Sequence, residues 1–184
     1  MSESNPNSLR DEAIKLGKSA KTEEDFAAAD NKFQEAENGD LQRGFRELAV
    51  NNIFRACLQA RCGLNNPNYQ PEDSLLSLGI HRFYELDRND QYRVNTIGRV
   101  SVLETLHGSK LKGFTRAIGA IVSSAFSESP WRPHSNQDLS RRDRARAKSK
   151  ALARGVGALT VSVLSLGGSE THSTTNKLAD KVLF

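Results

Sequence analysis

Apolar residues recur every three or four positions along most of this chain, a spacing that predicts α-helices rather than strands. The stretch 110–126 shows the pattern most clearly, because its large apolar side chains fall on one helical face. The residues of that face are Leu111, Phe114, Ile118, Ile121, Val122 and Ala125. The expected helices cover 8–19, 22–38, 41–62, 73–78, 92–107, 110–126 and 174–183.

Two further stretches have an ambiguous pattern. Residues 80–86 fit either a helix or a strand. Residues 155–169 carry no charge and fit the helical period, although part of the run has a strand-like composition. A helix is favoured there because a lone strand would need a partner and the chain offers few others.

These patterns predict an all-α fold, an irregular bundle of about six or seven helices with a basic C-terminal segment. The side chains expected in the core are the large apolar ones of the helical stripes. They are Phe26, Phe33, Phe45, Leu48, Ile53, Ile97, Val100, Leu103, Phe114, Ile118 and Val122.

Several helix ends are also readable. Thr22 is placed to cap the helix that follows it, with Asp25 among the acids of the first turn. Asp40 is a candidate cap for the next helix. Gly39, Gly63 and Gly79 are expected to end helices, because glycine is common just beyond a helix terminus.

The length of 184 residues suits one domain with appendages. We expect an acidic, polar arm over 1–21, a helical core domain over 22–126, a linker rich in Pro and Trp over 127–138, and a basic region over 139–184. The linker contains Trp131, which either stacks on a nucleic-acid base or, more commonly for such a residue, pins the linker to the core.

The densest charge in the chain lies at Ser140–Arg154, where seven cations accompany a single acid, Asp143. Such a segment cannot be buried without losing the hydration of its charges, so it must face solvent or a polyanion. As an extended ribbon it would place alternate cations on one face, whereas its alanines favour a helix. The cations are Arg141, Arg142, Arg144, Arg146, Lys148, Lys150 and Arg154.

Charge is unevenly distributed over the rest of the chain. Residues 1–40 carry a net charge of −5, and residues 139–184 carry +6, within a total of +4. This asymmetry favours a nucleic-acid or membrane-surface partner, and it also allows the acidic end to dock on the basic one. A second basic cluster, Lys110, Lys112 and Arg116, either extends the binding surface or forms an ordinary solvated face.

No enzyme motif is present, and we expect no catalytic residues, cofactor or metal site. The four histidines are isolated from one another, and Cys57 and Cys62 point about 140° apart on a helix, so they are poorly placed to form a disulfide. Neither a secretory signal nor a membrane-spanning run is evident, which favours a cytoplasmic or nuclear protein.

The leading expectation is a non-catalytic nucleic-acid-binding protein, with RNA favoured over DNA and with self-association along the polymer. No family motif supports this, but small helical proteins with basic tails include viral coat proteins, nucleocapsid proteins and RNA-binding suppressors. The alternative is a helical interaction adaptor whose basic segment meets an acidic protein or an anionic membrane surface. A solvated basic face and a targeting signal are the other interpretations of Ser140–Arg154.

Overall fold

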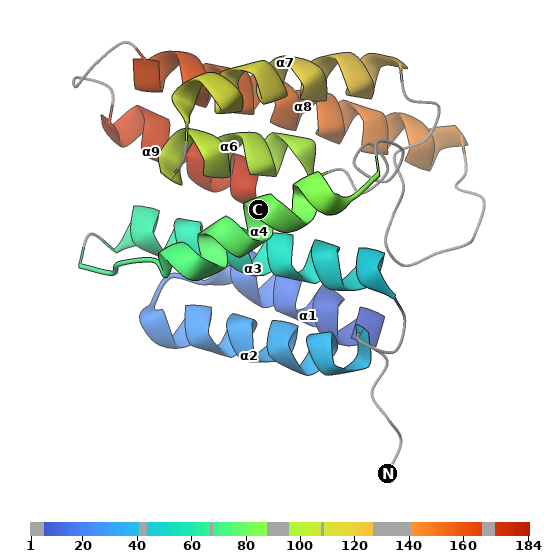
Figure 1. The fold of residues 1–184 in the computed structure, drawn as a ribbon, viewed down its shortest axis with the longest axis vertical. Coiled ribbons are helices and arrows are strands. Elements are labelled where there is room, and N and C mark those ends of the chain that lie inside the picture. The colour runs from blue at the N-terminus through green and yellow to red at the C-terminus, as the bar shows by residue number, and fades with distance from the viewer. Residues whose placement is uncertain are drawn as a thin grey trace. The chain divides into compact units, whose positions relative to one another are not determined.

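The computed structural model describes residues 6–40, 44–66, 68–87, 96–107, 109–126, 141–166 and 172–184. Over these residues it contains eight α-helices and no strand, which confirms the all-α prediction with one helix more than the upper estimate. The helices are α1 (Pro6–Ser19), α2 (Glu23–Asp40), α3 (Phe45–Asn65), α4 (Asp73–Glu85), α6 (Ile97–His107), α7 (Lys110–Phe126), α8 (Arg141–Leu166) and α9 (His172–Leu183) (Figure 1).

The chain divides into two compact units, each with its own core. Unit 1 comprises Met1–Leu86 together with the last residue, Phe184, and unit 2 comprises Asp87–Leu183. This division falls inside the stretch 22–126 that the sequence suggested as one domain. The expected arm 1–21 includes α1, which packs on α2 and contributes buried side chains at Leu9 and Ala13.

In unit 1, α1 pairs with α2 and α3 pairs with α4, while α2 also packs on α3. Phe33 and Phe54 stack at the centre, with ring centroids 6.1 Å apart. The start of α2 is the predicted capping arrangement, because the Asp25 backbone N–H donates to Thr22 Oγ1 at 3.3 Å and Asp25 Oδ2 accepts from the Thr22 N–H at 3.1 Å. These reciprocal bonds satisfy donors that a helix start leaves open.

The glycines expected to end helices lie inside them instead. Gly39 belongs to α2, Gly63 to α3 and Gly79 to α4. At all three positions a residue of a neighbouring segment occupies the space that a side chain would need. A Cβ on Gly79 would overlap Ala56 Cβ, and one on Gly39 would overlap Pro6 Cγ. A Cβ on Gly63 would lie 2.8 Å from Pro71 Cγ. Asp40 is the last residue of α2 rather than a cap, and α3 begins after Gly44, whose φ of 131° suits glycine.

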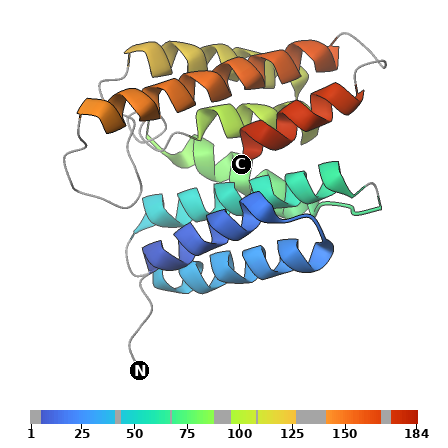
Figure 2. The ribbon, with the colours of Figure 1, turned by 180° about the vertical axis from the view of Figure 1, so that it is seen from behind.

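Unit 2 is formed by α6, α7, α8 and α9, and α8 packs against the other three (Figures 1 and 2). Residues 141–154 of the basic segment and residues 155–166 of the charge-free run form this one helix of 26 residues. The prediction of a helix is therefore confirmed for 155–166, and the described part of the basic segment is helical rather than extended. Residues 127–140 and 167–171 lie outside the described part of the chain.

The α7–α8 pair is held by small residues. Ala117 and Ala120 are buried on α7, and Ala151, Gly155 and Ala158 are buried on α8. A Cβ on Gly155 would lie 3.0 Å from Ile121 Cγ1, so the two backbones approach closely there. The helices are antiparallel, because Lys110 at the start of α7 donates to the Ser165 carbonyl near the end of α8 at 2.6 Å.

Close packing through small residues overturns part of the predicted core. Phe26, Phe33, Ile53, Ile97, Val100 and Leu103 are buried as expected. Ile118 and Val122 are 43 % and 50 % exposed, however, because α7 turns its small-residue face inward and its large apolar residues outward. Phe45, at the first turn of α3, is 44 % exposed, whereas Leu48 and Phe114 are half-buried.

Candidate nucleic-acid interface

The amino-terminal half of α8 carries the basic side chains that the sequence selected. Arg142, Arg146 and Lys150, hereafter the basic ridge, are all exposed and recur every four residues. This spacing places successive charges about 6 Å apart along the helix, with a gradual rotation of about 40° per step. Within the described residues, none of the three forms an ion pair with a carboxylate.

The remaining cations of the segment have different surroundings. Lys148 is half-buried and lies on the other side of α8. Arg154 is half-buried where α8 crosses α6, and its backbone comes within 3.4 Å of a Cβ built on Gly98. Arg141 and Arg144 are in α8, but their side chains are outside the described part of the structure. The segment is therefore not uniformly available, and the basic ridge is its best-defined part.

The second basic cluster lies on α7, and its members also differ. Lys112 is exposed, and Lys110 is exposed while donating to the Ser165 carbonyl. The Arg116 Nε donates to Glu104 Oε2 at 2.8 Å, and this carboxylate side chain is only 3 % exposed. Arg116 thereby compensates a buried charge on α6, so its first role is structural.

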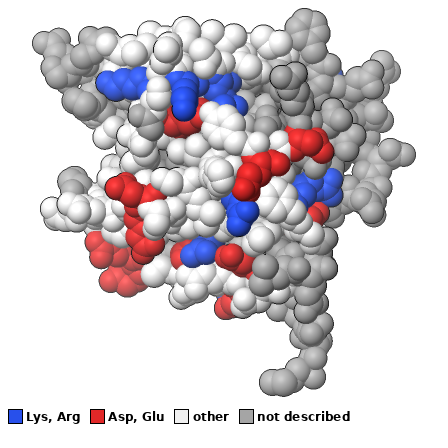
Figure 3. All heavy atoms as spheres, viewed as in Figure 1, with Lys and Arg blue, Asp and Glu red and all other residues white. Residues whose placement is uncertain are grey.

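The two basic regions do not form one groove along α8. Lys110 contacts Ser165, which is fifteen residues beyond Lys150 and therefore about 22 Å farther along the helix. Figure 3 shows one face of unit 2 on which a short row of basic side chains meets an acidic one, amid a largely uncharged described surface. Trp131, the remaining residue of the predicted site, lies outside the described residues.

Helix α8 also carries exposed apolar side chains, which its sequence did not identify. Beyond the basic ridge, Leu152, Val156, Val163 and Leu166 remain 41–55 % exposed. The helical period of residues 155–169 predicts a helix but does not say which of its faces is exposed. The signal that would have identified them is the competing stripe of small residues on the same helix, which permits closer packing than the large side chains do.

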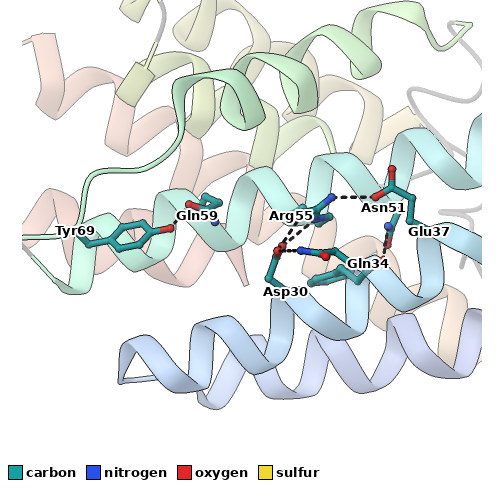
Figure 4. Close-up of polar contacts among 8 residues, drawn as sticks. Asp30, Gln34, Glu37, Asn51, Arg55, Gln59 and Tyr69 are labelled. Atoms are coloured by element: carbon teal, nitrogen blue, oxygen red, sulfur yellow. Dashed lines mark hydrogen bonds and ion pairs between the residues drawn. The ribbon is translucent and has the colours of Figure 1, made fainter.

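Unit 1 contains a separate pocket of about 190 Å³ between α2, α3 and the segment leading into α4. Tyr69 and Gln59 lie on its wall and are hydrogen-bonded to each other (Figure 4). Burial, followed by the charge of Glu23, raises the pKa of Cys62 in this wall to about 11. The thiol is therefore neutral and unsuited to nucleophilic chemistry, and the pocket is smaller than typical ligand sites of roughly 300–1,000 Å³.

Several carboxylates of the acidic first forty residues are paired within unit 1. Asp30 and Glu37 bind Arg55, and Glu35 binds Lys32. These acids are accordingly less available to dock on the basic segment. Among the described residues, no three His, Cys, Asp or Glu side chains are grouped so that they could hold a metal ion.

None of the described helices is both long enough and apolar enough to cross a bilayer. Comparison with known proteins assigns no family to the chain. No protein-family model matches it, and no curated protein or solved structure shows significant similarity to it.

Proposed function

We propose that this protein binds nucleic acid, RNA in preference to DNA, through contacts between the basic ridge and backbone phosphates. The observation that carries the proposal is the basic ridge itself. Its three cations are exposed, form no ion pair within the described residues, and lie on one side of α8, a helix that packs against α6, α7 and α9. Arginine matches a phosphate with a planar fork of donors, and arginine-rich segments are recurrent RNA-binding elements.

The binding proposed here selects charge rather than sequence, because phosphate contacts carry no base information. It requires no catalysis, cofactor or metal. Arg116 is left out because of its pairing with Glu104. Lys148 and Lys112 stay predicted contacts, since Lys148 lies on the other side of α8 and Lys112 lies at the start of α7. Arg141, Arg144, Arg154 and Trp131 stay predicted contacts, since the described geometry adds no separate support for them.

Salt dependence provides the first test. The three phosphate contacts of the basic ridge would give a slope of log affinity against log salt of roughly −2 on single strands and nearly −3 on duplex DNA. The measurement is fluorescence anisotropy with RNA and DNA oligonucleotides of one sequence, titrated across salt concentrations. A slope near zero would exclude phosphate contacts as the source of affinity.

A variant pair locates the contacts. Arg142→Ala, Arg146→Ala and Lys150→Ala together remove the ridge, and they should weaken binding at least tenfold and flatten the salt slope. The matched control is Lys15→Ala, Lys177→Ala and Lys181→Ala, which removes three exposed cations elsewhere. Equal losses in both triple variants would mean that only net charge matters. Binding of the wild-type chain to anionic vesicles but not to RNA would instead favour an interaction adaptor.

A further inference from the structure

The carboxyl-terminal half of α8 carries an apolar stripe that the fold of unit 2 leaves uncovered. Its members are spaced alternately by four and three residues, which keeps them within about 40° of one line along the helix. Leu159 is half-buried and the others are 41–55 % exposed. The stripe consists of Leu152, Val156, Leu159, Val163 and Leu166.

Helix α7 continues this surface with Leu111, Ile118 and Val122, which are 67 %, 43 % and 50 % exposed. The apolar stripe of α8 and these three residues of α7 lie on the side of the α7–α8 pair that faces away from α6. On α7, Gly113 faces α6, since a Cβ there would lie 2.8 Å from the Ser101 carbonyl. Ile118 lies about 140° around the helix from Gly113.

The same relation holds on α8. Ser162 Oγ lies 2.8 Å from Thr105 Oγ1 of α6, and Val163 follows Ser162 by one residue, about 100° around the helix. The stripes therefore form one apolar surface across the two helices, hereafter the outer face. Its exposed members are Leu111, Ile118, Val122, Leu152, Val156, Val163 and Leu166.

The size and composition of the outer face indicate a partner surface. Seven large apolar side chains, each about half exposed, amount to several hundred Å², which is at or above the largest patch of a typical monomer, roughly 300–600 Å². No charged residue belongs to it. This area approaches the roughly 800 Å² that each partner contributes to a standard protein–protein interface. An apolar surface of the same size on a partner protein could therefore cover the outer face.

We propose that the outer face is the docking site for a second copy of this chain. The stripe on α8 repeats every 3.5 residues on average, the spacing that lets two helices interlock along a seam. A twofold axis would set the outer face against itself, and α7 and α8 from each copy would form a four-helix layer. A lipid surface fits less well, because the outer face has no Trp or Tyr, the residues favoured at the membrane interface.

The charges on α8 determine the orientation. The basic ridge lies at the amino-terminal end of the helix and the stripe at the other end. Parallel pairing would bring two ridges together, whereas antiparallel pairing moves them to opposite ends. The dimer is therefore antiparallel along α8. The role of this dimer in binding rests on the proposed function. The two basic ridges of one dimer would contact one nucleic-acid strand at two points and so strengthen its binding.

The test is sedimentation velocity on nuclease-treated full-length protein at high salt, where phosphate contacts are weak. The wild-type chain should sediment at twice 20.3 kDa at micromolar concentrations. Val156→Gln with Val163→Gln should return it to one chain mass, with unchanged helix content by circular dichroism. Ala153→Gln with Thr160→Gln is the matched control, because these exposed residues are also seven apart on α8 but off the stripe, and it should stay dimeric.

A wild-type chain that stays monomeric throughout overturns the proposal, and so does a dimer that survives both valine substitutions. A monomer that binds anionic vesicles, and loses this binding in the valine variant alone, overturns it in favour of lipid. The triple ridge variant separates this inference from the proposed function. A dimer that persists in this variant supports the docking site whether or not RNA binding is found.

Discussion

Arg55 of α3 and Asp30 of α2 are joined by two hydrogen bonds, from Nε to Oδ1 at 2.9 Å and from Nη2 to Oδ2 at 3.1 Å. Arg55 Nη1 also donates to Glu37 Oε2 at 2.9 Å, and Gln34 Nε2 donates to Asp30 Oδ2 at 2.7 Å (Figure 4). Burial by itself would lower the pKa of Arg55, but the carboxylates of Asp30 and Glu37 more than offset it, so the pKa is raised. The pair fixes α2 against α3.

Removing one partner of this pair should destabilise unit 1. We expect Asp30→Ala to lower the free energy of unfolding by about 2–3 kcal/mol. The largely buried guanidinium of Arg55 loses its bidentate carboxylate acceptor, while Glu37 still compensates part of its charge. Lys32→Ala removes a more exposed pair from the same helix and should cost less than about 0.5 kcal/mol. Urea denaturation followed by circular dichroism measures both, and similar values would contradict this assignment.

The fold class was predictable because helical periodicity and the Thr22–Asp25 cap are local signals. The packing of α7 was not. Its large apolar residues and its small residues occupy different faces, and the sequence does not say which face neighbouring helices will cover. The fold buries Gly113 and Ala117 and exposes Ile118, because polar links such as Ser101 Oγ to the Gly113 carbonyl at 2.6 Å hold α6 close to the small face.

Two glycines of α7 test this packing. A Cβ on Gly113 would lie 2.8 Å from the Ser101 carbonyl and 3.0 Å from the Thr105 amide nitrogen, both backbone atoms that cannot move easily. Gly113→Ala should therefore destabilise the protein by about 1–3 kcal/mol. Gly119 has no atom within 4 Å of such a Cβ, so Gly119→Ala should stabilise the protein by about 0.5–1 kcal/mol. Thermal unfolding of the two variants should shift in opposite directions, and a shift in the same direction would contradict the packing.

The Thr22–Asp25 cap predicts a pH dependence. Hydrogen bonds from the backbone N–H groups of Lys21 and Thr22 lower the pKa of Asp25 below its ordinary 3.8. A lowered carboxyl pKa adds stability above pH 3.8, and this contribution disappears as the pH falls through the lower, folded-state pKa. The melting temperature of Asp25→Ala should lie below that of the wild-type chain at neutral pH, with the gap narrowing in acid. Glu24→Ala, in the same turn, should show a smaller gap, and a pH-independent Asp25→Ala gap would refute the account.

The candidate site was predictable in part, because charge density marks α8 whatever its surroundings. The sequence does not show that Arg146 is exposed whereas Arg154 is half-buried where α8 crosses α6. It also does not show that Arg116 forms an ion pair with the buried Glu104. Such distinctions depend on which helices cover which side of α8, and they arise only from tertiary packing. The separation of Lys110 from the basic ridge has the same origin, since it follows from the antiparallel pairing of α7 with α8.

Thiol chemistry tests the burial of Cys62, which with Cys57 is a free, buried cysteine. Desolvation and the charge of Glu23 raise the pKa of the Cys62 thiol from 9.0 to about 11, so the thiolate at pH 8 is depleted about 100-fold relative to an ordinary cysteine. An aromatic disulfide reagent should therefore label the native chain slowly, at a rate rising about tenfold per pH unit beyond pH 9. Both thiols should react at once in denaturant. Glu23→Gln should quicken native labelling only modestly, because burial is the larger cause, and a rate that levels off near pH 9 would show the thiol to be solvated.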